Sequence, residues 1–171
     1  MVFALQQLQP DAMFRSLMFF PTGPDQDNWL SWRWLSPVFL HLSSAHLVLN
    51  LSLLLTLGGA IERRQGAWTL VLLTLVGGVL ANVAQYWLVG PWFAGFSGVG
   101  YTIVGFYFLM GWRSPELKYQ LAGANFYISV GFMLAGFADL LWVNTANWAH
   151  FVGLLCGLCI AALYPKSATT Q

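Results

Sequence analysis

A serine set between glycines is the first candidate for chemistry in this chain. Ser97 follows Gly95 and Phe96, precedes Gly98, and opens an apolar segment. Glycine lets the backbone turn sharply, and a serine at the start of a helix presents its hydroxyl beside backbone N–H groups. That arrangement suits a nucleophile next to an oxyanion site. Gly and Ser are also common where membrane helices pack, so the motif alone leaves a structural interpretation open.

Three further polar residues could complete such a site. His46 and Asn50 are spaced i, i+4 and therefore share one helix face, and His150 opens a later apolar segment. Taken singly, His150 could be a hydrogen-bonded interfacial residue, and His46 could be a surface residue bonded to the Trp-rich loop. Asn50 could join two helices. Polar groups buried in a membrane are costly and usually face inward, often for function.

Two glycines favour a close helix contact beside His150. Gly153 and Gly157 follow it at i+3 and i+7, on the face of the histidine. A stripe of small residues lets a neighbouring helix approach closely. If that neighbour is the segment that begins at Ser97, His150 comes within reach of the serine hydroxyl.

Other chemistries fit the sequence less well. His41, His46 and His150 could form a metal site, but the chain has no His-Glu-x-x-His motif and no carboxylate in mid-segment to complete a zinc site. An aspartyl mechanism needs two carboxylates in one site, and Asp139 stands alone near a segment end. Serine chemistry remains, and no metal or cofactor is predicted. The pair Cys156 and Cys159 lies in an apolar run and is predicted to be buried and inert.

The composition predicts an integral membrane protein. Of the 171 residues, 58% are hydrophobic and 8% are charged, whereas soluble domains carry roughly 25% charged residues. The formal net charge is only +1, which provides no basic surface for nucleic acid. The lipid bilayer is therefore the predicted surrounding.

The apolar segments predict an all-α, polytopic bundle in a single domain. Residues 1–8 would form a helix of about 12 Å, too short for a hydrocarbon core of roughly 30 Å, so they are interpreted as the remnant of a truncated first helix or as an interfacial piece. A Trp-rich, membrane-surface loop is expected at 9–43 and a cytoplasmic tail at 165–171. Five complete spans are expected in between, with Gly, Pro or charged breaks separating them: 44–61, 67–88, 97–112, 121–140 and 149–164.

The basic residues predict the orientation of these spans. Two fall on the side where the spans at 44, 97 and 149 begin, Arg15 and Arg33. Five fall on the other side, which is therefore assigned to the cytoplasm: Arg63, Arg64, Arg113, Lys118 and Lys166. Because those three spans run in the same direction, His46, Asn50, Ser97 and His150 are expected at a similar depth on the outer side.

These motifs together resemble the rhomboid family of intramembrane serine proteases, most closely its bacterial GlpG type. The resemblance covers nearly the whole chain. It departs at the amino terminus, where the family core has a complete first helix. The matching elements, in order, are Trp32-Arg33, His41, His46 to Asn50, Glu62-Arg63-Arg64, Gly95 to Tyr101, and Ala149-His150 with Gly153 and Gly157.

The resemblance implies a function and a role for each residue. Ser97 would be the nucleophile and His150 the general base, while His46, Asn50 and the Ser97 N–H would bind the oxyanion. Tyr101 would pack against the catalytic histidine. The span at 121–140 and the loop at 142–148 would form a gate and cap.

The resemblance also implies substrates and a location. Transmembrane proteins would be the substrates, in a multi-pass protein of the bacterial inner membrane whose active site opens to the periplasm. A non-catalytic rhomboid-fold protein that binds transmembrane segments is the alternative. Relatives of that kind typically lack the Ser or the His, and this chain has both.

Overall fold

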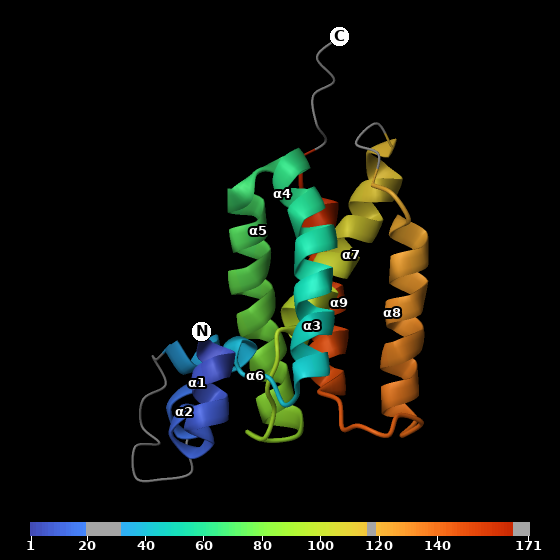
Figure 1. Cartoon of the computed structure of the whole chain (residues 1–171). Helices are drawn as coiled ribbons and strands as arrows, with labels where there is room; N and C mark the ends of the chain where they lie inside the picture. The colour runs from blue at the N-terminus through green and yellow to red at the C-terminus, as the bar shows by residue number, and fades with distance from the viewer. Residues whose placement is uncertain (20–31, 116–118, 166–171) are drawn as a thin grey trace.

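The computed structural model describes residues 1–19, 32–115 and 119–165, and every regular element within these ranges is helical (Figure 1). Part of the predicted surface loop, Lys118, Lys166 and the predicted tail from residue 166 onward lie outside the described residues.

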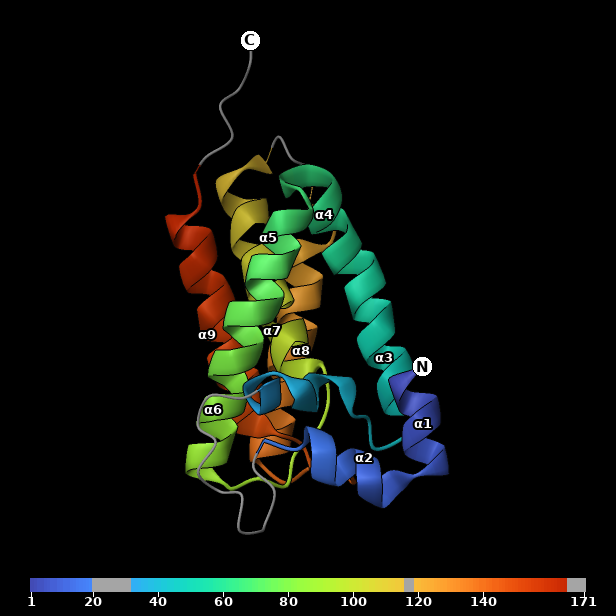
Figure 2. The same cartoon turned by 90° about the vertical axis from the view of Figure 1, so that its left-hand side faces the viewer.

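Short helices cover one end of the bundle (Figure 2). They are α1 (Val2–Leu8), α2 (Pro10–Leu17) and two 3-10 turns, η1 (Trp32–Trp34) and η2 (Ser36–Phe39). The buried Gln6 side chain donates to the His41 carbonyl at 2.6 Å and accepts from the His41 N–H at 3.1 Å. The Ser36 hydroxyl donates to the Leu17 carbonyl at 2.7 Å. The first eight residues are therefore attached to the segment that leads into the site.

Two long helices form an antiparallel hairpin. The first joins α3 (Ser44–Leu53), the π-helical turn η3 (Leu54–Gly58) and α4 (Gly59–Gln65); the second joins α5 (Ala67–Leu72), the π-helical turn η4 (Leu73–Gly77) and α6 (Gly78–Leu88). Only Gly66 separates them, at a φ of 87° that favours glycine. The predicted break at 62–66 was thus too long, because the basic side chains at 63 and 64 are compatible with a helix C-terminus.

Three more helices complete the bundle: α7 (Ser97–Arg113), α8 (Ala122–Phe137) and α9 (Asn147–Leu163). Apart from the extension to Gln65, the helix ends lie within three residues of the predicted spans. By length and apolarity, the continuous helices Ser44–Gln65 and Ala67–Leu88 are each sufficient to cross a membrane, whereas α8 and α9 are shorter apolar helices. The count of five spans therefore remains a prediction.

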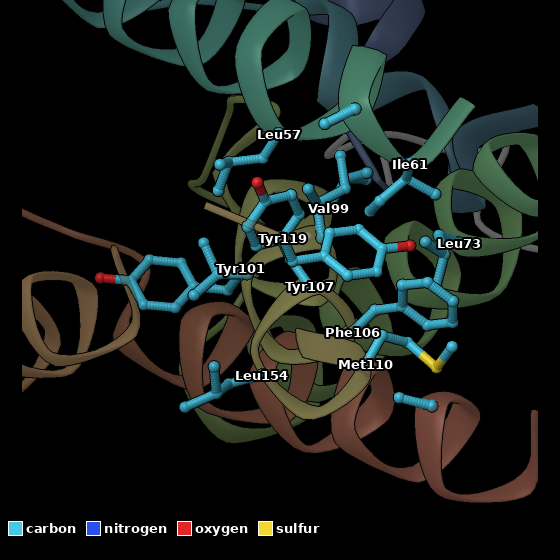
Figure 3. Close-up of a cluster of buried hydrophobic side chains, with 14 of the residues drawn as sticks. Leu57, Ile61, Leu73, Val99, Tyr101, Phe106, Tyr107, Met110, Tyr119 and Leu154 are labelled. Carbon is cyan, nitrogen blue, oxygen red and sulfur yellow. The ribbon is translucent and has the colours of Figure 1, made fainter. Parts of the chain in front are cut away.

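Helix α7 lies at the centre of the bundle and is buried along most of its length (Figure 1). Its side chains contribute much of the main core cluster, which includes Phe106, Tyr107 and Met110 and is completed by residues such as Ile61 and Leu73 (Figure 3). An apolar helix surrounded by others is typical of a buried element.

Helices α7 and α9 share the most extensive contact in the fold, and glycines bring their backbones together. A Cβ added at Gly153 would overlap the Gly98 carbonyl, and one added at Gly157 would overlap the Thr102 carbonyl. In the reverse direction, a Cβ at Gly105 would overlap the Leu154 carbonyl. Helix α7 is thus the neighbour against which the glycine stripe of α9 packs. Helix α9 buries Cys156 but leaves Cys159 exposed, so the predicted burial of Cys159 was wrong.

Candidate active site

The first turns of α7 and α9 bring a serine and a histidine together. Nε2 of His150 lies 2.9 Å from Oγ of Ser97. Ser97 is the first residue of α7, and the buried His150 lies in the first turn of α9. For Nε2 to accept the hydroxyl proton, the ring proton must be on Nδ1. Nδ1 is buried, and no hydrogen-bond partner for it lies in the described part of the chain.

Tyr101 holds the histidine ring from one side. Its ring stacks on His150, with centroids 4.4 Å apart and planes 18° from parallel. Its hydroxyl donates to the Ser129 carbonyl of α8 at 2.8 Å, and Figure 3 shows this hydroxyl pointing out of the labelled cluster. Offset stacking of aromatic rings is favourable, so the pair restrains rotation of the imidazole.

Gly95 allows His46 to lie against the segment that leads into Ser97. Gly95 has a φ of 126°, and a Cβ added there would lie 2.5 Å from Cε1 and 2.7 Å from Nε2 of His46. The Gly95 N–H donates to the Pro37 carbonyl at 3.0 Å. Only glycine fits both the backbone angle and the space, so this segment passes directly beside the histidine ring.

Asn50 lies one turn after His46 on α3. Its side chain is buried, and its Nδ2 donor has no hydrogen-bond partner among the described residues. A buried, unpaired amide donor costs roughly 1–3 kcal/mol. A buried donor without a partner is usually kept in a protein because it has a binding or catalytic role.

His41 packs edge to face against His46, with ring centroids 5.1 Å apart and an interplanar angle of 62°. Burial lowers the pKa of His41, and the neighbouring His46 lowers it further, while a backbone hydrogen bond at Phe39 opposes the shift. Among the described residues, no group of three or more His, Cys, Asp or Glu side chains is arranged to hold a metal ion.

Two supporting residues were missed by the sequence analysis. Gln85 of α6 is buried, and its Oε1 accepts the Ala149 N–H at 3.1 Å, next to His150. Thr102 of α7 is fully buried, and its hydroxyl donates to the Gly98 carbonyl at 3.1 Å. A glutamine within an apolar span was the available signal for the first. Nothing in the sequence marks Thr102, because its partner is a backbone atom.

Gly98 marks the place where three helices meet. A Cβ added to it would lie 2.8 Å from the Cβ of Ala81 on α6 and 3.5 Å from the Cβ of Ala149 on α9. Small residues on all three helices thus keep the Ser97 turn close to His150.

The fold and the site together define the class of protein. It is a helical membrane protein whose exposed helix surfaces are rich in large apolar side chains and whose interior holds a hydrogen-bonded Ser–His pair. A model of the rhomboid domain matches residues 28–167. The chain belongs to the rhomboid family.

Individual relatives agree with this membership. The chain is 36% identical over 160 residues to the rhomboid protease GlpG of Klebsiella pneumoniae, which covers 94% of this chain and 58% of the relative. It is 32% identical over 161 residues to the rhomboid protease GlpG of an Enterobacter species, with the same coverage of 94% and 58%. For the rhomboid protease GlpG of Salmonella choleraesuis, identity is 36% over 130 residues, 76% of this chain and 47% of the relative. The chain thus spans less than two thirds of the length of these relatives.

Proposed function

We propose that this chain is an intramembrane serine endopeptidase that hydrolyses peptide bonds in or next to transmembrane segments. The observation that carries the proposal is the 2.9 Å approach of His150 Nε2 to Ser97 Oγ at the meeting point of α7 and α9. Relatives named rhomboid proteases support the same reaction class.

In the proposed reaction, Ser97 Oγ attacks the scissile carbonyl carbon while His150 Nε2 takes the hydroxyl proton. The resulting tetrahedral intermediate collapses when His150 returns that proton to the leaving amine, which breaks the C–N bond and leaves an acyl-serine. Water then attacks the ester with His150 again as the base, releasing the acid and restoring Ser97. No carboxylate is needed in this scheme, because Tyr101 orients the imidazole by stacking on it.

The oxyanion would be bound by the Ser97 N–H and by side chains of α3. Asn50 Nδ2 has no hydrogen-bond partner among the residues that the structure describes, and His46 lies against the backbone at Gly95, two residues before the nucleophile. Each donor of this kind typically contributes about 2.7–4 kcal/mol to transition-state stabilisation. An unpaired donor in the resting protein is what such a pre-organised site requires.

A transmembrane substrate has to enter from the side and unwind locally, because its carbonyls are bonded within its own helix. Helix α8 is the proposed gate, with the residues at 142–148 as the cap. Of its residues only Met133 and Gly136 are buried, so α8 separates from the bundle at lower cost than α7 or α9 would. The Tyr101–Ser129 hydrogen bond links this helix to the site.

The proposal includes a topology and a location. Five complete spans follow the short helices α1 and α2 in a single domain. The side that carries Arg63, Arg64 and Arg113 faces the cytoplasm. In a bacterial inner membrane, the site would then open toward the periplasm, where substrates are cut near their outer ends.

Labelling by a fluorophosphonate, which reacts with activated serines, tests the proposal directly. The purified parent should be labelled, and both Ser97→Ala and His150→Ala should lose the label. Ser52→Ala, which removes an exposed serine of α3, is the matched control and should be labelled like the parent. Equal labelling of Ser97→Ala and the parent would contradict the serine mechanism.

A further inference from the structure

The first helix of the chain contacts the bundle through a polar side chain. Within α1, which lies entirely in the described part of the chain, Gln6 is the only buried residue, with 3% of its surface exposed. Leu5 and Leu8 of the same helix are exposed. The helix lies at the end of the bundle where α3 begins (Figure 2). Because a helix usually buries apolar side chains, a buried glutamine indicates a specific partner.

That partner is the backbone of a single residue, His41. Nε2 of Gln6 donates to the His41 carbonyl at 2.6 Å, and Oε1 accepts the His41 N–H at 3.1 Å. Two bonds from one planar amide fix the position and the orientation of the His41 backbone. Two residues later, the Ser43 hydroxyl accepts the His46 N–H at 3.2 Å and caps α3. Gln6 therefore holds the segment that leads directly into the helix of His46.

The side chain of His41 contacts the ring of His46. It is 5% exposed, and neither of its ring nitrogens has a hydrogen-bond partner among the described residues. Burial of polar atoms without partners is unfavourable, so the rest of the structure has to hold this ring in place. The centroids of the two rings are 5.1 Å apart, and the edge-to-face angle is 62°. The His46 ring also lies against Gly95, where an added Cβ would be 2.5 Å from Cε1. The His41 ring and the Gly95 backbone thus both restrict rotation of the His46 ring.

We propose that Gln6 is a positioning residue for catalysis, which holds the His41 ring against His46 and so fixes the direction in which His46 donates to the oxyanion. This role rests on the proposed function, in which His46 and Asn50 bind the oxyanion. Gln6 itself touches no reacting group, since its two bonds go to the His41 backbone.

The expected effect of Gln6 is on rate more than on substrate binding. An oxyanion donor stabilises charge that develops only in the transition state, and its contribution depends on precise placement. Loss of that placement lowers kcat and leaves KM almost unchanged. A bond that merely attached α1 to the bundle would change the stability of the protein and not the rate of the folded enzyme.

Substitution of Gln6 tests this difference. Gln6→Met keeps an unbranched side chain of similar length and removes both bonds. The kcat for a model transmembrane substrate should fall about tenfold or more, with KM within about twofold of the parent value. Gln7→Met is the matched control, because Gln7 is the exposed neighbour on the same helix, and it should keep the parental kcat. Gln6→Asn is one methylene too short to reach both backbone groups. It should lower kcat in the same way, which keeps the test decisive if Gln6→Met does not fold.

A double-mutant cycle with His41→Ala shows whether the effect passes through the His41 ring. His41→Ala removes the ring but leaves the backbone groups to which Gln6 bonds. Gln6→Met should therefore lower the unfolding temperature similarly in the parent and in His41→Ala. Its effect on kcat should instead shrink to less than about twofold in the His41→Ala background, because the ring that Gln6 positions is already absent.

The outcomes separate this role from the proposed function. A parent that neither cleaves the substrate nor reacts with a fluorophosphonate would overturn the proposed function, and the role of Gln6 with it. In an active parent, equal kcat values for the Gln6 variants and Gln7→Met would overturn the role of Gln6 alone. The same conclusion would follow if Gln6→Met lowered kcat equally in the parent and in His41→Ala, since the bonds would then not act through the His41 ring.

Discussion

The hydroxyl of Tyr101 donates a 2.8 Å hydrogen bond to the backbone carbonyl of Ser129, which connects α7 to α8. The ring of the same tyrosine stacks on His150 of α9. The Tyr101 side chain therefore both bonds to α8 and orients the proposed general base. Displacement of α8 by a substrate would break the hydrogen bond while leaving the stacked rings in contact.

Tyr101→Phe should separate these two contributions. The ring remains, so stacking persists, but the bond to α8 is lost, and such a bond is worth about 0.5–1.5 kcal/mol. We expect turnover of a model transmembrane substrate to change by at most about tenfold. Tyr107→Phe is the matched control, since it removes a 3.2 Å hydrogen bond to the Gln120 carbonyl in the turn after α7. It should lose similar stability and keep parental turnover; equal turnover changes in both variants would contradict the link.

Much of the site could be predicted because it depends on direction and periodicity. The count of spans places the starts of α3, α7 and α9 at one end of the bundle, and Gly153 and Gly157 fall on the face of His150 by helical spacing. Those two facts suffice to expect Ser97 near His150. The structure has the two atoms at 2.9 Å.

The features that could not be predicted involve backbone partners or single torsion angles. Gln85 accepts from the Ala149 N–H, and Thr102 donates to the Gly98 carbonyl. A pattern of side-chain types in the sequence does not predict a main-chain partner. The turn between the two long helices needs only Gly66, so hydropathy and charge overestimated the length of the break predicted at 62–66. The π-helical turns at Leu54–Gly58 and Leu73–Gly77 lie within uninterrupted apolar helices, and no hydropathy or charge pattern predicted them.

Removing either member of the Ser–His pair should abolish cleavage and leave the fold intact. Ser97→Ala and His150→Ala each remove one side of the 2.9 Å contact. Turnover should fall by several orders of magnitude, as expected when a nucleophile or its base is lost. Thermal unfolding of the purified variants provides the control, and cleavage that persists in Ser97→Ala would exclude this residue as the nucleophile.

The orientation can be measured with reporter fusions. A reporter fused after Tyr164 should indicate the cytoplasm, and one inserted at 90–93 should indicate the outside, because five basic residues against two favour that orientation. The opposite result would place Ser97 and His150 on the cytoplasmic side and overturn the proposed direction of substrate entry.

Gln85→Leu should lower turnover by loosening the start of α9, although it leaves Ser97 and His150 themselves unchanged. The Ala149 N–H would lose its acceptor, which costs about 1–3 kcal/mol for a buried donor. Asn82→Leu, one turn earlier on α6, removes a bond to the Trp34 carbonyl instead and is the control. We expect Gln85→Leu to lower turnover more than Asn82→Leu at similar stability. The reverse order would show that Gln85 does not position His150.

Gly153→Val tests whether the backbone contact of α7 and α9 sets the geometry of the pair. A Cβ at this position already overlaps the Gly98 carbonyl and would lie 3.3 Å from the Thr102 hydroxyl, so the branched side chain has to force the helices apart. Overpacking of this kind typically costs about 1–3 kcal/mol. The larger expected effect is on rate, because a displacement of about 1 Å between reacting groups can cost on the order of a hundredfold.

Leu154→Val is the matched variant for this prediction. Leu154 lies about 100° further round α9. It is buried in the main core cluster, so losing a methylene there should cost about 1 kcal/mol of stability. Because the shortened side chain leaves the Gly153–Gly98 contact intact, turnover should stay close to that of the parent. Thermal unfolding and substrate turnover, measured on both detergent-purified variants, separate the two effects. If Gly153→Val were as stable and as active as the parent, the glycine contact could not be what holds His150 beside Ser97.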